Sequence, residues 1–172
     1  MRFAPVSLAL SCVFAITASV SHSQAPVALS PRAAALEAAG KASLGAGDAE
    51  GAVNAFEAAL AVQPDASPLV LDMALAARQQ GLQGKAIHYY RAVLAQEPAN
   101  LEAIAGEGAA LAEKGALDKA RHDLARLQTL CGADCAEAHG LALEIDRHAA
   151  SATQAGQVAA AALAPEARVS VN

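Results

Sequence analysis

Small and apolar residues recur along this chain with a period of 34 positions. A shift of that length places Gly47 on Gly81 and then on Gly115. The same shift aligns Ala52 with Ala86 and Ala120, Phe56 with Tyr90 and Leu124, Pro64 with Pro98 and Gly132, and Leu36 with Val70 and Ile104. A fixed period of this size indicates a repeat architecture, in which each unit buries its apolar face against its neighbours.

Within each unit, the apolar spacing of three and four residues predicts two amphipathic helices. Ser30-Pro31 and Ser67-Pro68 each place a capping hydroxyl before a proline of the first helical turn. The repeated glycines end the first helices, where a residue that tolerates positive φ is favoured. Pro64 and Pro98 end the second helices. The pattern predicts an all-α chain of three stacked helix pairs.

Residue size also alternates with the period. Gly40, Ala74 and Gly108 have little or no side chain, which allows the partner helix of each unit to approach closely. Phe56 and Tyr90 are expected to fill the volume between neighbouring units. The third unit departs from this pattern, because Leu124 replaces the aromatic residue and Gly132 the proline.

The end of the chain predicts a cap followed by a tail. Residues 136–149 have helical apolar spacing and are expected to cover the last apolar face of the array. Residues 151–172 are small and polar, and we expect a mobile tail there, with one weak helix at residues 158–163.

Composition adds to this interpretation. The chain has 49 alanines in 172 residues, 55% hydrophobic residues, 3% aromatic residues and no tryptophan. It is too apolar for a disordered chain and lacks the β-branched and aromatic content of a β-sandwich. Alanine at this density favours helices packed at short distances. The formal net charge of −5 and the absence of a basic patch argue against a nucleic-acid partner.

The N-terminus is typical of a secretory signal peptide. Arg2 is followed by an uncharged run from Val6 to Val20 and then by Ser21-His22-Ser23. The competing interpretation is an uncleaved anchor, but this run is shorter than the ~20 residues of a membrane-spanning helix. We expect residues 1–23 to be cleaved, residues 24–30 to form a linker, and the mature protein to be periplasmic or secreted without spanning a membrane.

The recurring glycine, alanine, aromatic and proline positions resemble the tetratricopeptide repeat (TPR) family. The resemblance implies an α-solenoid domain over residues 31–150. Its parts are three helix-turn-helix units at about 33–66, 67–100 and 101–134, and the capping helix. The signal style suggests an exported bacterial member of the family.

In this family the first helices line a concave groove that binds a peptide or a helix. The resemblance places in this groove Glu37, Lys41, Leu44, Leu71, Asp72, Leu75, Arg78, Glu102, Ala105 and Ala109. The members that bind chaperone tails clamp a terminal carboxylate with basic residues, and a single lysine among the matching positions does not make that clamp. The leucines and alanines suit an apolar peptide or amphipathic helix, with Lys41 and Arg78 as charge anchors. The alternative for each leucine is packing on the neighbouring unit.

Cys131 and Cys135 are the two cysteines that remain after signal cleavage. In an oxidising compartment nearby cysteines usually pair, and positions four apart on a helix lie roughly 6 Å apart, within disulfide range. We expect a structural disulfide that fixes the turn where the proline is missing. The alternatives are a metal-binding stripe with His139 and a redox-active pair, and both fit the spacing less well.

No nucleophile and base stand at an interpretable spacing, and no cofactor or metal motif is present. The leading hypothesis is therefore a non-enzymatic adaptor of the bacterial cell envelope that binds a partner protein in the groove. The alternative is a periplasmic thiol-redox or metal-handling protein that uses the cysteine pair. Self-association through the ends of the solenoid is a third hypothesis.

Overall fold

The computed structural model describes residues 28–163, which contain seven helices and no strand. The predicted signal peptide lies outside these residues, as do residues 24–27 of the linker and residues 164–172 of the tail. The helices are α1 (Pro31–Gly45), α2 (Ala49–Val62), α3 (Ser67–Gln79), α4 (Gln83–Gln96), α5 (Leu101–Glu113), α6 (Leu117–Cys131) and α7 (Ala136–Leu163). No helix in the described range is long and apolar enough to cross a membrane.

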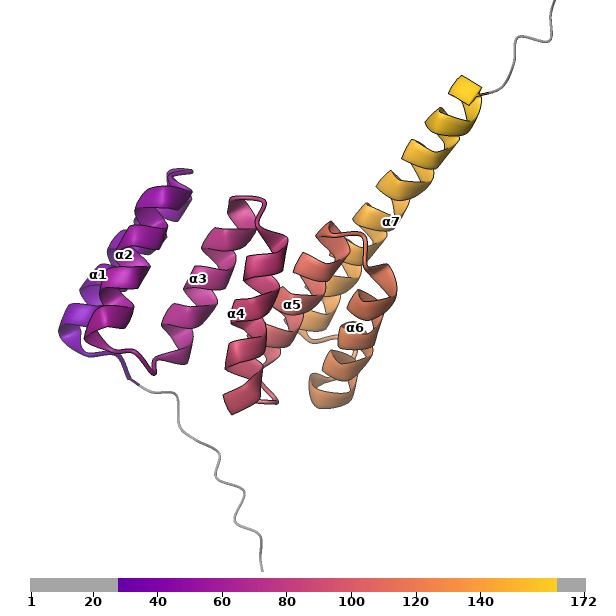
Figure 1. The fold of residues 1–172 in the computed structure, drawn as a ribbon. Coiled ribbons are helices and arrows are strands. Elements are labelled where there is room, and N and C mark those ends of the chain that lie inside the picture. Colours follow the sequence, from indigo (N-terminus) through magenta and orange to yellow (C-terminus); the bar gives the residue numbers. More distant parts are fainter. Residues whose placement is uncertain (1–27, 164–172) are drawn as a thin grey trace, which may run out of the picture.

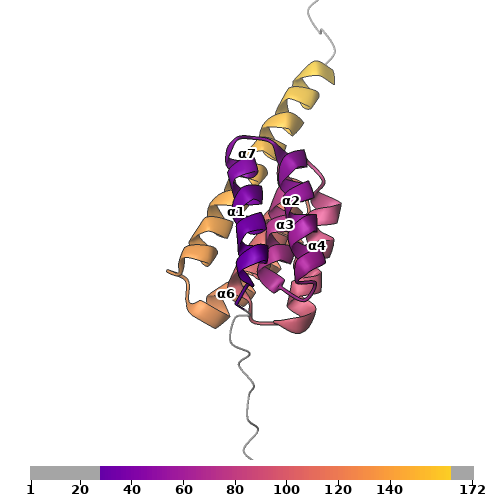
Figure 2. The same cartoon turned by 90° about the vertical axis from the view of Figure 1, so that its left-hand side faces the viewer.

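The helices stack as three antiparallel pairs followed by α7 (Figure 1). The first helices of the pairs, α1, α3 and α5, form one layer with α7, since each contacts the next member. The second helices α2, α4 and α6 cover the other side, and Figure 2 shows the stack from its N-terminal end. The predicted all-α solenoid of helix-turn-helix units is confirmed.

The turns inside the pairs have the backbone that the repeated glycines predicted. Gly47, Gly81 and Gly115 have φ of 80°, 74° and 81°, a region in which a Cβ is disfavoured. Each follows the end of a first helix, so the period of the sequence is the period of these turns.

Only one of the two predicted serine caps is present. The Ser30 hydroxyl accepts a hydrogen bond from the Ala33 N–H at 3.3 Å. The cap expected at Ser67 is wrong, because α3 begins one residue earlier than expected: the Ala66 carbonyl accepts from the Leu69 N–H at 3.0 Å. Ser67 is therefore already the first helical residue, and its side chain makes no capping bond.

Close approach at the small positions is also present. A Cβ added at Gly40 would lie 2.8 Å from Cζ of Phe56, and one added at Gly108 would lie 2.6 Å from Cδ2 of Leu141. Phe56 is fully buried. These glycines let an aromatic or branched side chain of a neighbouring helix sit against the helix backbone.

The core is divided along the stack. Leu44, Phe56 and Met73 belong to a cluster of buried side chains shared by α1, α2 and α3. A larger cluster, which includes Tyr90 and Leu141, extends from α3 to α7. Among the described helices, α3 is the only one beyond the first pair that lies next to α1 and α2, and from α4 Tyr89 packs against their cluster. Stability is thus a sum of neighbouring interfaces, as expected for a repeat protein.

The C-terminal end differs from the prediction. The cap was expected to end at residue 149 and to be followed by a mobile tail with one weak helix at residues 158–163, but α7 continues as one helix to Leu163. Its first half packs on α5 and α6, and its second half projects beyond the stack (Figure 1). All residues from Ala150 to Ala162 are exposed. The small residues were interpreted as a linker. However, alanine has the highest helix propensity, and after Pro98 the next proline is Pro165, beyond the end of α7.

Candidate binding groove

A cleft of about 380 Å³ opens on the layer formed by α3, α5 and α7. The cleft is lined by Leu71, Leu75, Arg78, Tyr90, Glu102, Ala105, Gly106, Ala109, Glu137, Gly140, Leu141 and Glu144. Its size is within the ~300–1,000 Å³ range of ligand-binding clefts.

The cleft arises because the side chains at equivalent positions become smaller from α3 to α5 to α7. The fifth residue of α3 is Leu71, of α5 Ala105 and of α7 Gly140. All three lie at the same position of parallel, adjacent helices, so the missing side-chain volume opens the space between α5 and α7.

Tyr90 reaches this cleft from α4 in the other layer. A Cβ at Gly106 would lie 2.7 Å from the Tyr90 Oη, so the glycine is what lets the phenol lie against α5. Tyr90 is only 4% exposed. Burial raises the pKa of Tyr90, and the positive charge of Arg78 opposes that rise. Tyr90 thus supplies an aromatic floor that stays neutral at physiological pH.

Arg78, one of the two expected charge anchors, is already paired. Its Nη2 donates to Oε1 of Glu113, and its Nε donates to Oε2 of the same carboxylate at 3.4 Å. Burial lowers the pKa of Arg78, but the hydrogen bond and charge of Glu113 outweigh burial and raise it overall. A bidentate guanidinium–carboxylate pair is the strong form of this contact, so the charge of Arg78 is largely neutralised.

The carboxylates of the cleft differ in how they are paired. Glu144 lies 3.1 Å from Nη2 of Arg147 and 3.8 Å from Nε2 of His148 on its own helix. Glu102 and Glu137 form no ion pair within residues 28–163. The unneutralised charge of the cleft is therefore negative.

Three of the predicted groove residues form a separate cluster between α1 of the first unit and α3 of the second. Nζ of Lys41 lies 2.6 Å from Oε1 of Glu37 and 3.5 Å from Oδ2 of Asp72. Burial raises the pKa of Asp72 to about 7, Lys41 opposes the rise, and Glu37 adds to it. Lys41 is thus engaged by two carboxylates and is not a free anchor.

Leu44, also predicted for the groove, lies instead in the N-terminal core and is 8% exposed. Its position near the end of α1 turns it toward Phe56 and Met73. The structure brings together six of the predicted groove residues: Leu71, Leu75, Arg78, Glu102, Ala105 and Ala109. Leu71 is 7% exposed and Leu75 is 40% exposed, so Leu75 is the more available of the two leucines.

The prediction missed Tyr90, Gly106 and the four cleft residues of α7. The sequence pattern predicts that Tyr90 packs between neighbouring units and that the helix after Cys135 only covers the last apolar face. The signal that α7 belongs to the lining is its register: Glu137 and Gly140 occupy the positions in α7 that Glu102 and Ala105 occupy in α5.

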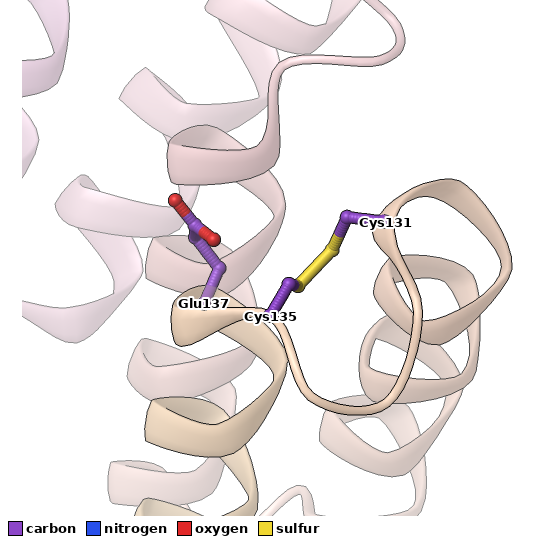
Figure 3. A group of neighbouring side chains, drawn as sticks. All are labelled: Cys131, Cys135 and Glu137. Carbon is purple, nitrogen blue, oxygen red and sulfur yellow. A yellow bond between two sulfur atoms is a disulfide. The ribbon is translucent and has the colours of Figure 1, made fainter.

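Cys131 and Cys135 meet at the junction of α6 and α7 (Figure 3). Their Cα atoms are 5.9 Å apart, and the two sulfur atoms are joined. Glu137 is the third member of this group, with ligand atoms all within 4.8 Å of one another. His139, the third residue of the expected metal stripe, is not part of it. Sulfur atoms joined to each other are not free thiolates, which a metal ion would require.

Neither a family model nor a curated protein sequence matches the chain. Solved structures do match. The first TPR domain of human RPAP3 has a TM-score of 0.61 and 21% identity, over 70% of this chain and 94% of that one. The TPR domain of Sgt2 from Aspergillus fumigatus has a TM-score of 0.61 and 16% identity, over 84% and 91%. The first TPR of Spaghetti (RPAP3), bound to the HSP90 peptide SRMEEVD, has a TM-score of 0.60 and 20% identity, over 69% and 94%. The three structures share one architecture with this protein: the chain has the fold of a TPR domain.

Proposed function

We propose that the protein is a non-enzymatic adaptor that binds a peptide or helix of a partner protein in the cleft between α3, α5 and α7. The observation that carries the proposal is the cleft itself, which combines an apolar floor with charged groups at its rim. Support comes from a neighbour of the same fold that is solved with a bound peptide, the TPR of Spaghetti.

We further propose that the adaptor works in the bacterial cell envelope after its signal peptide is removed. The support is the charged, apolar and small-residue order of residues 1–23. N-terminal sequencing of the exported protein tests this, and an N-terminus at Gln24 is the expected result. A protein that keeps Met1 in the mature form would contradict it.

Gly140 offers a position from which the cleft can be filled, and this gives the test of the adaptor function. Gly140 lines the cleft and a Cβ added there meets nothing within 4 Å, so Gly140→Leu places an apolar side chain in the cleft from a position that has room for its Cβ. Gly156→Leu is the matched control, because Gly156 lies on the same helix, also has open space around it and is outside the cleft.

The expected result is that crosslinking and affinity capture with the full chain recover a partner, and that Gly140→Leu abolishes its recovery. Leu75→Asp, which makes an exposed wall of the cleft polar, is expected to act in the same way. Capture that survives both changes would show that the partner binds elsewhere and would refute the groove as the working surface.

We propose that the Cys131–Cys135 bond forms in the exported protein and fixes the start of α7. Thiol titration of the unfolded protein is expected to find no free thiol among these two residues until a reductant is added. The second candidate function, metal handling, is favoured only by the nearness of Glu137. Stoichiometric zinc in the protein as isolated, together with two free thiols, would support that candidate and refute the structural disulfide.

A further inference from the structure

We propose that the cleft selects a segment that carries a lysine or arginine beside an apolar side chain, and that it rejects acidic peptides. This inference rests on the proposed binding function and specifies the chemistry of the partner. It departs from the expectation that Arg78 and Lys41 act as positive anchors, because both are paired with carboxylates of the chain itself.

The first step is the charge of the lining. Three carboxylates and one guanidinium line the cleft. The guanidinium of Arg78 is held by Glu113, and the carboxylate of Glu144 faces Arg147 and His148. Glu102 and Glu137 are left without a cationic partner among the described residues. A ligand therefore meets two uncompensated negative charges.

The second step is where these two charges lie. Glu102 is the second residue of α5 and Glu137 the second residue of α7, and the two helices are parallel and in contact. Both carboxylates thus stand at the same end of the cleft. The opposite end holds the internally paired groups Arg78 and Glu144. The cationic group of the ligand belongs at the end marked by Glu102 and Glu137.

The favourable interaction of Glu102 and Glu137 with the N-termini of their own helices does not neutralise their charge. Carboxylates in the first turn interact favourably with the helix macrodipole, which corresponds to roughly half a positive charge at the N-terminus. That partial charge offsets a full carboxylate charge only in part, and both side chains line the cleft. The net field over this end of the cleft remains negative.

The third step is the apolar part of the ligand. Tyr90, Leu141 and Leu71 are nearly buried and line the cleft below the charged rim. The space of about 380 Å³ accepts one or two large side chains of a bound segment. A ligand segment with an apolar side chain next to a basic one is complementary to both the apolar floor and the negative rim of the cleft. Electrostatic complementarity of this kind contributes mainly to specificity.

The contrast with the structural neighbour is direct. The peptide SRMEEVD, bound by the TPR of Spaghetti, has three acidic residues and one arginine among seven, so its side chains are net negative. In this chain the uncompensated charges of Glu102 and Glu137 would repel the net negative charge of such a peptide. The same fold is thus predicted to have the opposite charge preference.

The test uses two helical peptides of about 14 residues with identical leucine and alanine positions, one with three lysines and one with three glutamates. Both have blocked ends, so that only their side chains differ in charge. Binding to the full-length protein is followed by fluorescence anisotropy at low and at high salt. The lysine peptide is expected to bind at least ~10-fold more tightly at low salt, and the preference should shrink at high salt, because salt screens exposed charges.

The double variant Glu102→Gln/Glu137→Gln is expected to reduce the preference for the lysine peptide to about threefold or less. The loss of preference is modest because each exposed ion pair contributes only a small part of the binding free energy. The matched control Glu57→Gln/Asp65→Asn removes two exposed carboxylates outside the cleft and should leave the preference unchanged. Equal binding of both peptides, tighter binding of the glutamate peptide, no binding of either, or a preference that survives the double glutamine variant would each overturn the inference.

Gly140→Leu separates this inference from the proposed function. Binding without charge preference that Gly140→Leu abolishes would refute the basic-peptide inference and leave the groove function standing. Binding that Gly140→Leu does not change would refute both.

Discussion

Gly40 and Gly140 are both helical glycines in the layer formed by α1, α3, α5 and α7, yet they have opposite surroundings. The ring of Phe56 occupies the place where a Cβ of Gly40 would be, whereas a Cβ of Gly140 would meet nothing within 4 Å. The sequence period identified Gly40 as a packing glycine. Gly140 does not lie on that period, and the sequence alone does not show how much space surrounds it, because that depends on which helix lies opposite.

Gly40→Ala is expected to destabilise the protein, and Gly140→Ala to stabilise it. Overpacking against the buried Phe56 ring should lower the free energy of unfolding by about 1–3 kcal/mol. At Gly140 the alanine only restricts the unfolded chain and favours the helix, which should raise the free energy of unfolding by about 0.5–1 kcal/mol. Urea unfolding of both variants measures the two effects, and a loss of stability in both would contradict the difference in packing.

Asp72 is predicted to make the protein less stable as the pH rises from about 4 to 7. Its pKa is raised by burial from 3.8 to about 7, while the unfolded carboxyl ionises near the ordinary value. Between these values the folded state holds a proton that the unfolded state has released, so the free energy of unfolding falls with rising pH. Asp72→Asn cannot ionise and should escape this loss.

The measurement is the free energy of unfolding of Asp72→Asn minus that of the wild type. This difference is expected to grow by on the order of a few kcal/mol between pH 4 and 7. Asp65→Asn, at an exposed carboxylate, controls for the loss of one acid. A difference for Asp72→Asn that stays constant over the range would show that Asp72 is ionised in the folded protein at low pH.

At the scale of the elements, α7 was predicted only in two pieces, a cap over residues 136–149 and one weak helix at residues 158–163. Its packed half carries the apolar spacing of Ala138, Leu141 and Ile145, which are all nearly buried. The projecting half has no such partner face, and only the high helix propensity of its alanines indicates a helix. The cleft was missed for a related reason, since it arises between α5 and α7 and so depends on α7 being part of the layer.

The two halves of α7 are expected to differ in hydrogen exchange. The projecting half makes no tertiary contacts that bury its side chains, and isolated helices below ~12–15 residues are marginal in water. Amides of residues 153–162 should therefore exchange at least ~10-fold faster than those of residues 141–148. Exchange followed by mass spectrometry measures both segments in one sample, and equal protection would indicate that the projecting half is covered in solution.

At the scale of the whole molecule, the stack is expected to unfold in parts. Phe56 is fully buried in the cluster of α1, α2 and α3, and replacing a buried phenylalanine by alanine costs about 3–5 kcal/mol. Since α1 and α2 have no neighbouring helix beyond α3 in the described chain, apart from the packing of Tyr89 of α4 on their cluster, Phe56→Ala should remove exchange protection from α1 and α2. It should leave α5 to α7 protected. Leu141→Ala, in the other cluster, should do the reverse. Loss of protection along the whole chain in either variant would show that the stack unfolds as one cooperative unit.

The solenoid itself was predictable, because its period is recorded in turn glycines and small packing residues that the backbone requires. The net charge of the groove could not be predicted from the sequence. Arg78 belongs to α3 and its partner Glu113 stands 35 residues later, so that only the stacking of α3 on α5 reveals that the positive charge is neutralised. Long-range pairing of this kind leaves no periodic signal in the sequence.

The projecting half of α7 makes this helix a mechanical lever. Its short arm is one wall of the cleft, its fulcrum is the contact with α5 and α6, and its long arm extends about 20 Å into solvent at 1.5 Å per residue. A force on the long arm, such as that from a second protein bound to residues 150–163, would tilt the wall of the cleft. The stiffness of a single helix in water would then set how much of that motion reaches the bound ligand.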